Sequence, residues 1–189
     1  MEKKIYLIRH CQAVGQPPES QLTAEGMKQA DRLADFLSSF KVDRIISSPF
    51  LRAVETIMPF AQKATIEIET DERLAERVLS SSSMPDWLEK LKLTFNDLDL
   101  KYEGGESSKE AMDRIIQAVN EMIESHAQNS VLVTHGNIMS LLLKSYNKSF
   151  GFDEWLQLSN PDVYCLQFKN DEVHCERIWR VLKSEEAEF

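Results

Sequence analysis

Short apolar runs alternate with amphipathic segments along most of the chain, and this alternation limits the fold more than any other feature. Three apolar runs predict buried strands over 4–8, 43–48 and 130–136. A polar–apolar alternation predicts another strand over 65–70. Strands that alternate with helices are typical of α/β proteins. We therefore expect an α/β three-layer α/β/α sandwich around a mostly parallel central sheet.

The helices between these strands carry start and stop signals. Thr23 is a plausible N-cap, Ser48 is expected to cap the next helix, and Pro59 is expected to kink or end it. Ser107 and Glu110 form a capping box that predicts a long amphipathic helix. The apolar face of the first helix is expected to comprise Met27, Ala30, Leu33, Ala34 and Leu37.

The remaining segments define the domain organisation. Residues 77–105 lose periodicity and are long for a simple connection, so they predict a functional excursion or small helical lid. Two strand-like segments around 170–171 predict a closing hairpin. We expect a single domain over 1–182, followed by an acidic, disordered tail over 183–189.

Composition restricts the setting and the partners of this chain. Of its 189 residues, 42% are hydrophobic and 28% are charged, with no apolar run near the length of about 20 residues that spans a bilayer. The net charge of -9 argues against nucleic acid or an anionic membrane as a partner. The short apolar stretch at the start argues against a secretory signal, and three cysteines make no disulfide framework, so we expect a cytoplasmic protein. No metal or nucleotide motif is present, so no cofactor is expected, and no feature assigns an oligomeric state.

The stretch YLIRHCQAVG places two candidate nucleophiles side by side, His10 and Cys11. A cysteine phosphatase needs an arginine after five intervening residues, to stabilise its thiolate and bind phosphate. Pro17 stands at that position, and no arginine occurs anywhere over 11–31. The missing cation argues against Cys11 as the nucleophile and favours a small residue packed in a turn.

His10 fits phosphoryl transfer better, because a neutral imidazole can attack phosphorus and the phosphohistidine can then be hydrolysed. Such a reaction needs cations and donors around the phosphate oxygens. Arg9, Arg52 and His135 are the natural candidates, because each follows or lies near the carboxyl end of a predicted strand. The leaving alkoxide also needs a proton, which a carboxyl group can supply.

The segments LIRHCQAVGQ, SSPFLRAVET, ERLAER, GGES and VTHG occur in the order found in the histidine phosphatase superfamily, whose members have the phosphoglycerate-mutase-like fold. The resemblance spans residues 3 to about 140. It implies that His10 accepts the phosphoryl group and that Glu76 is the acid/base, with Glu72, Glu103 and Glu106 as rival carboxyls. It assigns the phosphate pocket to Arg9, Arg52, His135 and Gln16, the last at the position of an asparagine that often contacts phosphate.

The resemblance leaves several points open. The family usually has glycine where this chain has Cys11, which we expect to be tolerated but which leaves a redox-sensitive site open. The favoured activity is a metal-independent phosphomonoesterase that acts on a small-molecule phosphate ester. The alternatives are a cofactor-dependent mutase of the phosphoglycerate type, a protein-phosphohistidine phosphatase and a non-catalytic phosphate-binding module. Apolar lid residues such as Trp87 are candidates for substrate contact or for simple packing.

Overall fold

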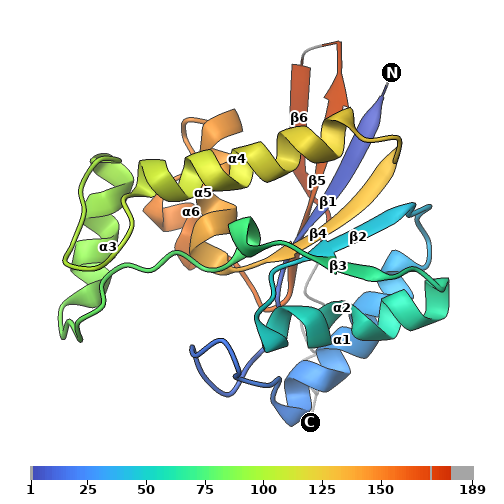
Figure 1. Ribbon diagram of the computed structural model, residues 1–189, viewed down its shortest axis with the longest axis horizontal. Helices are drawn as coiled ribbons and strands as arrows, with labels where there is room; N and C mark the ends of the chain where they lie inside the picture. Colours follow the sequence, from blue (N-terminus) through green and yellow to red (C-terminus); the bar gives the residue numbers. More distant parts are fainter. Residues whose placement is uncertain (1, 171, 180–189) are drawn as a thin grey trace, which may run out of the picture.

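The computed structural model describes residues 2–170 and 172–179 and is built on a central sheet (Figure 1). Within the described residues the sheet has six strands in the order β3-β2-β4-β1-β5-β6. The first four of these are mutually parallel, whereas β5 runs antiparallel to β1 and β6 antiparallel to β5. The strands are β1 (Lys3–Arg9), β2 (Arg44–Ser47), β3 (Ile68–Thr70), β4 (Asn129–Thr134), β5 (Asp162–Lys169) and β6 (Glu172–Arg177).

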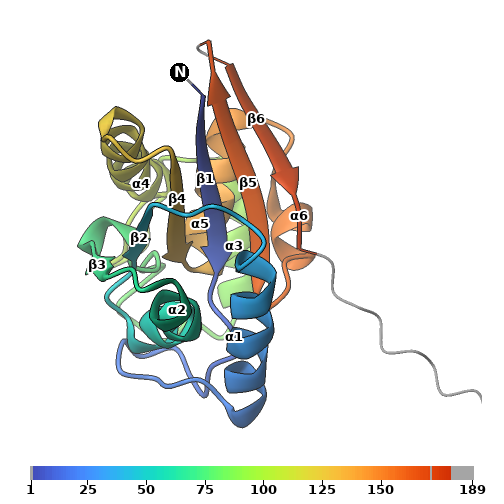
Figure 2. The same cartoon turned by 90° about the vertical axis from the view of Figure 1, so that its right-hand side faces the viewer.

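Helices cover both faces of this sheet, which confirms the predicted three-layer arrangement. Helices α1 (Ala24–Leu37) and α2 (Leu51–Ala64) lie on one face, and α4 (Ser108–Glu124) and α5 (Gly136–Tyr146) lie on the other (Figures 1 and 2). The smaller elements are the 3-10 turn η1 (Glu72–Leu74), α3 (Trp87–Asn96) and α6 (Phe152–Leu156).

The two cores follow from the alternation of side chains along the strands. In β1, Tyr6 and Ile8 pack toward α1 and α2, whereas Ile5 and Leu7 pack toward α4 and α5. A strand that is buried on both faces needs apolar residues at every position, which explains the continuous run in the sequence. No helix in the described part of the chain is long and apolar enough to cross a bilayer.

The predicted lid region contains α3, which lies at the amino end of α4, beyond the edge of the sheet (Figure 1). Leu91 and Phe95 of α3 pack against Met112 of α4 and Leu141 of α5. This small cluster extends the core outward. The segment is therefore a helical insertion with its own apolar anchor.

Several local predictions were wrong. The N-cap of α2 is Phe50, and the hydroxyl of Ser48 contacts the ring of His135. Pro59 does not end α2, which continues to a left-handed cap at Thr65. Met27 is 64% exposed because it lies outside the buried stripe of α1. The strand expected over 65–70 is shorter, and neither η1 nor α6 was predicted.

Other local predictions were confirmed. The capping box of Ser107 and Glu110 opens α4, and Thr23 caps α1. The closing hairpin consists of β5 and β6, with Asn170 in the left-handed region of backbone space at the turn. The tail predicted over 183–189 lies outside the described residues.

Candidate active site

The carboxyl ends of the four parallel strands meet at one edge of the sheet, and the predicted site residues come from these ends. Arg9 ends β1 and His10 follows it, His135 follows β4, and Arg52 lies in the first turn of α2 after β2. Glu76 follows β3 and η1. This edge is where ligands bind in parallel α/β sheets.

His10 is oriented by its own backbone neighbour. Its Nδ1 lies 2.6 Å from the carbonyl oxygen of Cys11, which can only accept, so Nδ1 carries the proton. Nε2 is then left with a lone pair, and Arg52 Nε donates to it across 3.3 Å. Burial lowers the pKa of His10 to about 3; the bond to Cys11 opposes this shift, and the positive charges of Arg52 and Arg9 add to it. The imidazole is therefore neutral at physiological pH.

Arg52 is only 1% exposed although it carries a charge. Its Nη1 donates to the carbonyl oxygens of Gln16 and Pro17, each across 2.9 Å, and its guanidinium lies 5.0 Å from the centre of the Phe50 ring. These contacts hold the Nη1 side of the guanidinium group in place while Nε faces His10. A buried arginine of this kind is a preformed anion-binding group.

His135 lies beside His10, with ring centroids 5.1 Å apart. Its Nε2 lies 2.7 Å from the hydroxyl of Ser48, and its buried Nδ1 has no partner in the described part of the chain. Burial, and then the positive charges near the site, lower the pKa of His135 well below its usual value. This leaves a ring nitrogen available to an oxygen of a bound ligand.

Arg9 reaches the site from the end of β1, close to the start of α5. Its Nη1 donates to the carbonyl oxygen of Leu158, and its buried Nε has no partner among the described residues. A Cβ atom at Gly136 would lie 3.0 Å from Arg9 Nε, so glycine at that position lets the guanidinium approach the start of α5.

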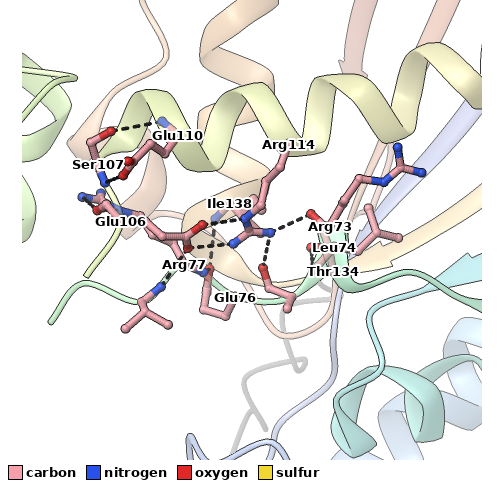
Figure 3. A network of polar contacts seen from close by, with 12 residues as sticks. Arg73, Leu74, Glu76, Arg77, Glu106, Ser107, Glu110, Arg114, Thr134 and Ile138 are labelled. Carbon is pink, nitrogen blue, oxygen red and sulfur yellow. Dashed lines mark hydrogen bonds and ion pairs between the residues drawn. The ribbon is translucent and has the colours of Figure 1, made fainter. Parts of the chain in front are cut away.

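Glu76 lies under the amino end of α5 (Figure 3). One carboxylate oxygen accepts from the backbone N–H groups of Arg77 and Ile138, and the other accepts from that of Asn137, across 2.9–3.1 Å. Both oxygens are therefore held at fixed positions at the edge of the site. The rival Glu72 and Glu103 are exposed, so neither shares this position.

A polar network fixes the backbone on either side of Glu76 (Figure 3). Arg114 of α4 donates to the carbonyl oxygens of Arg73 and Ala75 and forms a bidentate ion pair with Glu106. The third rival carboxylate, Glu106, is thus a structural partner of Arg114. The network connects the segment after β3 to α4 and so determines where Glu76 lies.

A cavity of about 830 Å³ is lined by Arg9, Arg52 and Glu76, whereas His10 and His135 are not among its lining residues. Gln16 lines it, but in the described structure only its backbone carbonyl is engaged, by Arg52. Asn137 was missed from the sequence; it is 7% exposed, and neither of its side-chain polar atoms has a partner within the described residues. The cavity is lined by Arg9, Gln16, Pro18, Phe50, Arg52, Glu76, Arg77, Val78, Leu79, Ser80, Ser82, Ser83, Met84, Trp87, Leu91, Gly136, Asn137 and Trp155.

Comparison with known proteins decides the family. The model of the histidine phosphatase superfamily (branch 1) matches residues 5–180, which is most of the chain. The chain belongs to the histidine phosphatase superfamily. The predicted family and the predicted class of enzyme are therefore confirmed.

Similar members of the superfamily carry different names. A protein of Salmonella choleraesuis (strain SC-B67) named "Probable phosphoglycerate mutase GpmB" is 25% identical, over 89% of this chain and 86% of its own length. A protein of Hydrogenobacter thermophilus named "Putative phosphoserine phosphatase 2" is 30% identical, over 75% and 77%. The mycobacterial glucosyl-3-phosphoglycerate phosphatase is 21% identical, with a TM-score of 0.76 over 94% of this chain and 98% of its own. The last likeness concerns the fold alone.

Cys11 departs from the usual glycine of the superfamily without disturbing the core. Its side chain is fully buried among the residues under α1 and α2, and its backbone N–H donates to the hydroxyl of Thr56. Burial raises the pKa of the thiol to about 12. Because oxidation proceeds through an accessible thiolate, this environment argues against the redox sensitivity that the sequence left open.

The loop before β5 contacts the backbone of His10, and no sequence pattern predicts this contact. Asn160 donates its side-chain amide to the carbonyl oxygen of His10 across 2.7 Å. The buried carboxylate of Asp162 accepts from the backbone of Ser159 and pairs with Arg177 of β6. This superfamily member therefore uses its closing hairpin to hold the strand end that carries His10.

Proposed function

We propose that the protein is a phosphomonoesterase that transfers the phosphoryl group of a small-molecule ester to Nε2 of His10 and then to water. The observation that carries this proposal is the state of His10: neutral, with Nδ1 bound to Cys11 and its Nε2 lone pair beside Arg52. A neutral imidazole is a competent nucleophile, and its Nε2 lone pair would become available when Arg52 Nε donates to a phosphate oxygen instead.

Arg9, Arg52 and His135 would hold the phosphate oxygens. The buried and unpartnered Arg9 Nε and His135 Nδ1 support this role, because buried polar atoms are normally satisfied, and a bound oxyanion would satisfy them. The two guanidinium groups would neutralise the negative charge that spreads over the equatorial oxygens during transfer. Gln16 would contact the phosphate from the rim of the cavity.

Glu76 would carry the proton. As the P–O bond to the alcohol breaks and the P–N bond to His10 forms, the carboxyl group would protonate the leaving oxygen. A water molecule would then attack phosphorus and give its proton to the carboxylate, while the P–N bond breaks and phosphate is released. The position of Glu76 on the wall of the cavity supports contact between its carboxyl group and the leaving oxygen.

The test is to trap the phosphoenzyme. Rapid acid-free quenching after mixing with a radiolabelled aryl phosphate is expected to give labelled protein in the wild type and none in His10→Ala. His126→Ala is the matched control, because His126 is exposed and lies between α4 and β4, outside the cavity. If His10→Ala keeps both the label and the turnover, the nucleophile is another group and the proposal fails.

A mutase remains the second candidate, because one relative carries a phosphoglycerate mutase name. Release of inorganic phosphate without added bisphosphoglycerate is expected for a phosphatase. Isomerisation of phosphoglycerate without such release would reverse the order of the two candidates. No labelled protein and no turnover with any ester would indicate a non-catalytic phosphate-binding module.

A further inference from the structure

The cavity has two chemically different halves. The inner half contains the charged groups around His10, whereas the outer half continues under α3 and α6. A volume of about 830 Å³ lies in the range of pockets that hold a whole small molecule, so phosphate would fill only part of it. The apolar residues that line the outer half are Leu79, Met84, Trp87, Leu91 and Trp155, and Ser80, Ser82 and Ser83 line it as well.

Trp87 and Trp155 form a corner in this outer half. Their ring centroids are 6.5 Å apart and the ring planes are almost perpendicular, at 86°. Trp155 is held from behind by Phe152, with centroids 5.4 Å apart, and Phe152 in turn contacts Phe95 of α3. Trp87 is 49% exposed, so a flat ligand could cover apolar surface that water now covers.

The outer half offers no free cation in the part of the chain that the structure describes. Arg77 lines the cavity but is buried, and it donates to the carbonyl oxygen of Glu106 and to the hydroxyls of Thr94 and Ser108. The lid lysines Lys90 and Lys92 are not among the lining residues. A carboxylate in the outer half would meet only neutral donors such as the hydroxyls of Ser82 and Ser83, with no free cation to offset its lost hydration, which is costly.

We propose that this site prefers the phosphate monoester of an uncharged alcohol that carries a flat aromatic group. This inference rests on the proposed phosphatase function and adds the class of substrate. The aromatic group packs in the corner of Trp87 and Trp155, while the phosphate lies at His10. Esters with a carboxylate next to the phosphate, such as phosphoglycerate and phosphoserine, are then poor substrates.

The experiment compares kcat/KM for three esters. They are naphthyl phosphate, glycerol phosphate (the ester of a small uncharged alcohol) and phosphoglycerate. Wild type is expected to prefer naphthyl phosphate to phosphoglycerate by about 100-fold. Trp87→Ala is expected to lower kcat/KM for naphthyl phosphate about tenfold while that for glycerol phosphate changes less than about twofold. Leu93→Ala is the matched control, because Leu93 is an exposed apolar residue of the same helix that does not line the cavity. It is expected to change neither value.

A second variant tests the charge argument by gain of activity. Ser83→Arg places a cation on the wall of the cavity. It is expected to raise kcat/KM for phosphoglycerate about tenfold and to leave that for naphthyl phosphate nearly unchanged. Trp87→Phe, which keeps an aromatic ring, is expected to retain most of the preference even if Trp87→Ala folds poorly.

The possible failures are distinguishable. If phosphoglycerate or phosphoserine is preferred by wild type, or if Trp87→Ala lowers all esters equally, the substrate class is wrong although the enzyme is a phosphatase. If no ester is turned over and no phosphoenzyme forms, the proposed function itself fails.

Discussion

The inner and outer halves of the cavity are held in different ways. Arg52 and His135 of the inner half are buried, and their contacts go to strand ends and to neighbouring backbone. Trp87 of the outer half is half exposed and lies on a helix that is anchored to the core by a small cluster. The comparison indicates that the groups proposed for chemistry are preorganised, whereas those proposed for recognition lie on a more exposed surface. Mutations should therefore act differently in the two halves.

The largest effect is expected from Arg52→Lys. Lysine keeps the charge but loses the planar fork that binds Gln16, Pro17 and the ligand at once, so kcat/KM should fall about 10²–10³-fold for every ester. Steady-state kinetics with aryl and alkyl phosphates would measure this. The matched control is Arg32→Lys, at an exposed arginine paired with Glu25, which should leave kcat/KM unchanged. A loss confined to one ester would contradict the division into two halves.

Glu76→Gln should have a large effect that depends on the leaving group. Alkyl phosphates need a proton on the leaving oxygen, so their turnover should fall about 10²-fold, whereas nitrophenyl phosphate, a good leaving group, should lose much less. The control is Glu103→Gln, which alters an exposed carboxylate outside the cavity. Equal losses for both kinds of ester would show that Glu76 only supports the start of α5.

The dependence of kcat/KM on pH tests the proposed roles of His10 and Glu76 together. Because burial lowers the pKa of His10 to about 3, the nucleophile stays neutral down to that region, and kcat/KM should show no acid limb near the usual histidine value. The optimum is expected on the acidic side of neutral, because a general acid acts in its protonated form. A rate that rises steadily into alkali would exclude a carboxyl donor.

Asn160→Ala should produce a smaller effect, because Asn160 acts through the backbone of His10. Loss of this contact should let the strand end move, so kcat should fall about tenfold with little change in KM. Asn160→Asp, which cannot donate in the same way, should behave like the alanine variant, and unfolding curves should show that both variants fold. If KM rises instead of kcat falling, Asn160 contacts the substrate and is more than a positioning residue.

The fold could be predicted wherever the signal was local. Strand β1 is buried on both faces and reads as an apolar run, and the capping box of Ser107 lies within four residues. His10 and Arg52 were expected to lie close together because strand ends in an α/β protein converge, and Arg52 Nε lies 3.3 Å from His10 Nε2. Ser48 was wrong as an N-cap because α2 begins at Leu51; its hydroxyl accepts from the N–H of Phe50 and contacts His135, 87 positions away. Asn160 was missed for the same reason, since it contacts a residue 150 positions away.

The last effect concerns stability in place of activity and distinguishes the buried half from the exposed one. Burial lowers the pKa of His10 to about 3, so the folded state takes up its proton only far below the value of the unfolded chain, near 6.5. The stability tied to neutral His10 is therefore present above pH about 6.5 and is lost as the pH falls toward 3.

His10→Gln removes this titration. Below pH 6.5 the free energy of unfolding of this variant should fall less steeply than that of the wild type, by up to about 1 kcal/mol per pH unit. Urea unfolding between pH 7 and about 4 would measure it, and His126→Gln, at an exposed histidine, should follow the wild-type curve. If both variants follow that curve, the imidazole of His10 is more accessible to water than its position implies, and the contrast between a fixed inner half and a variable outer half weakens.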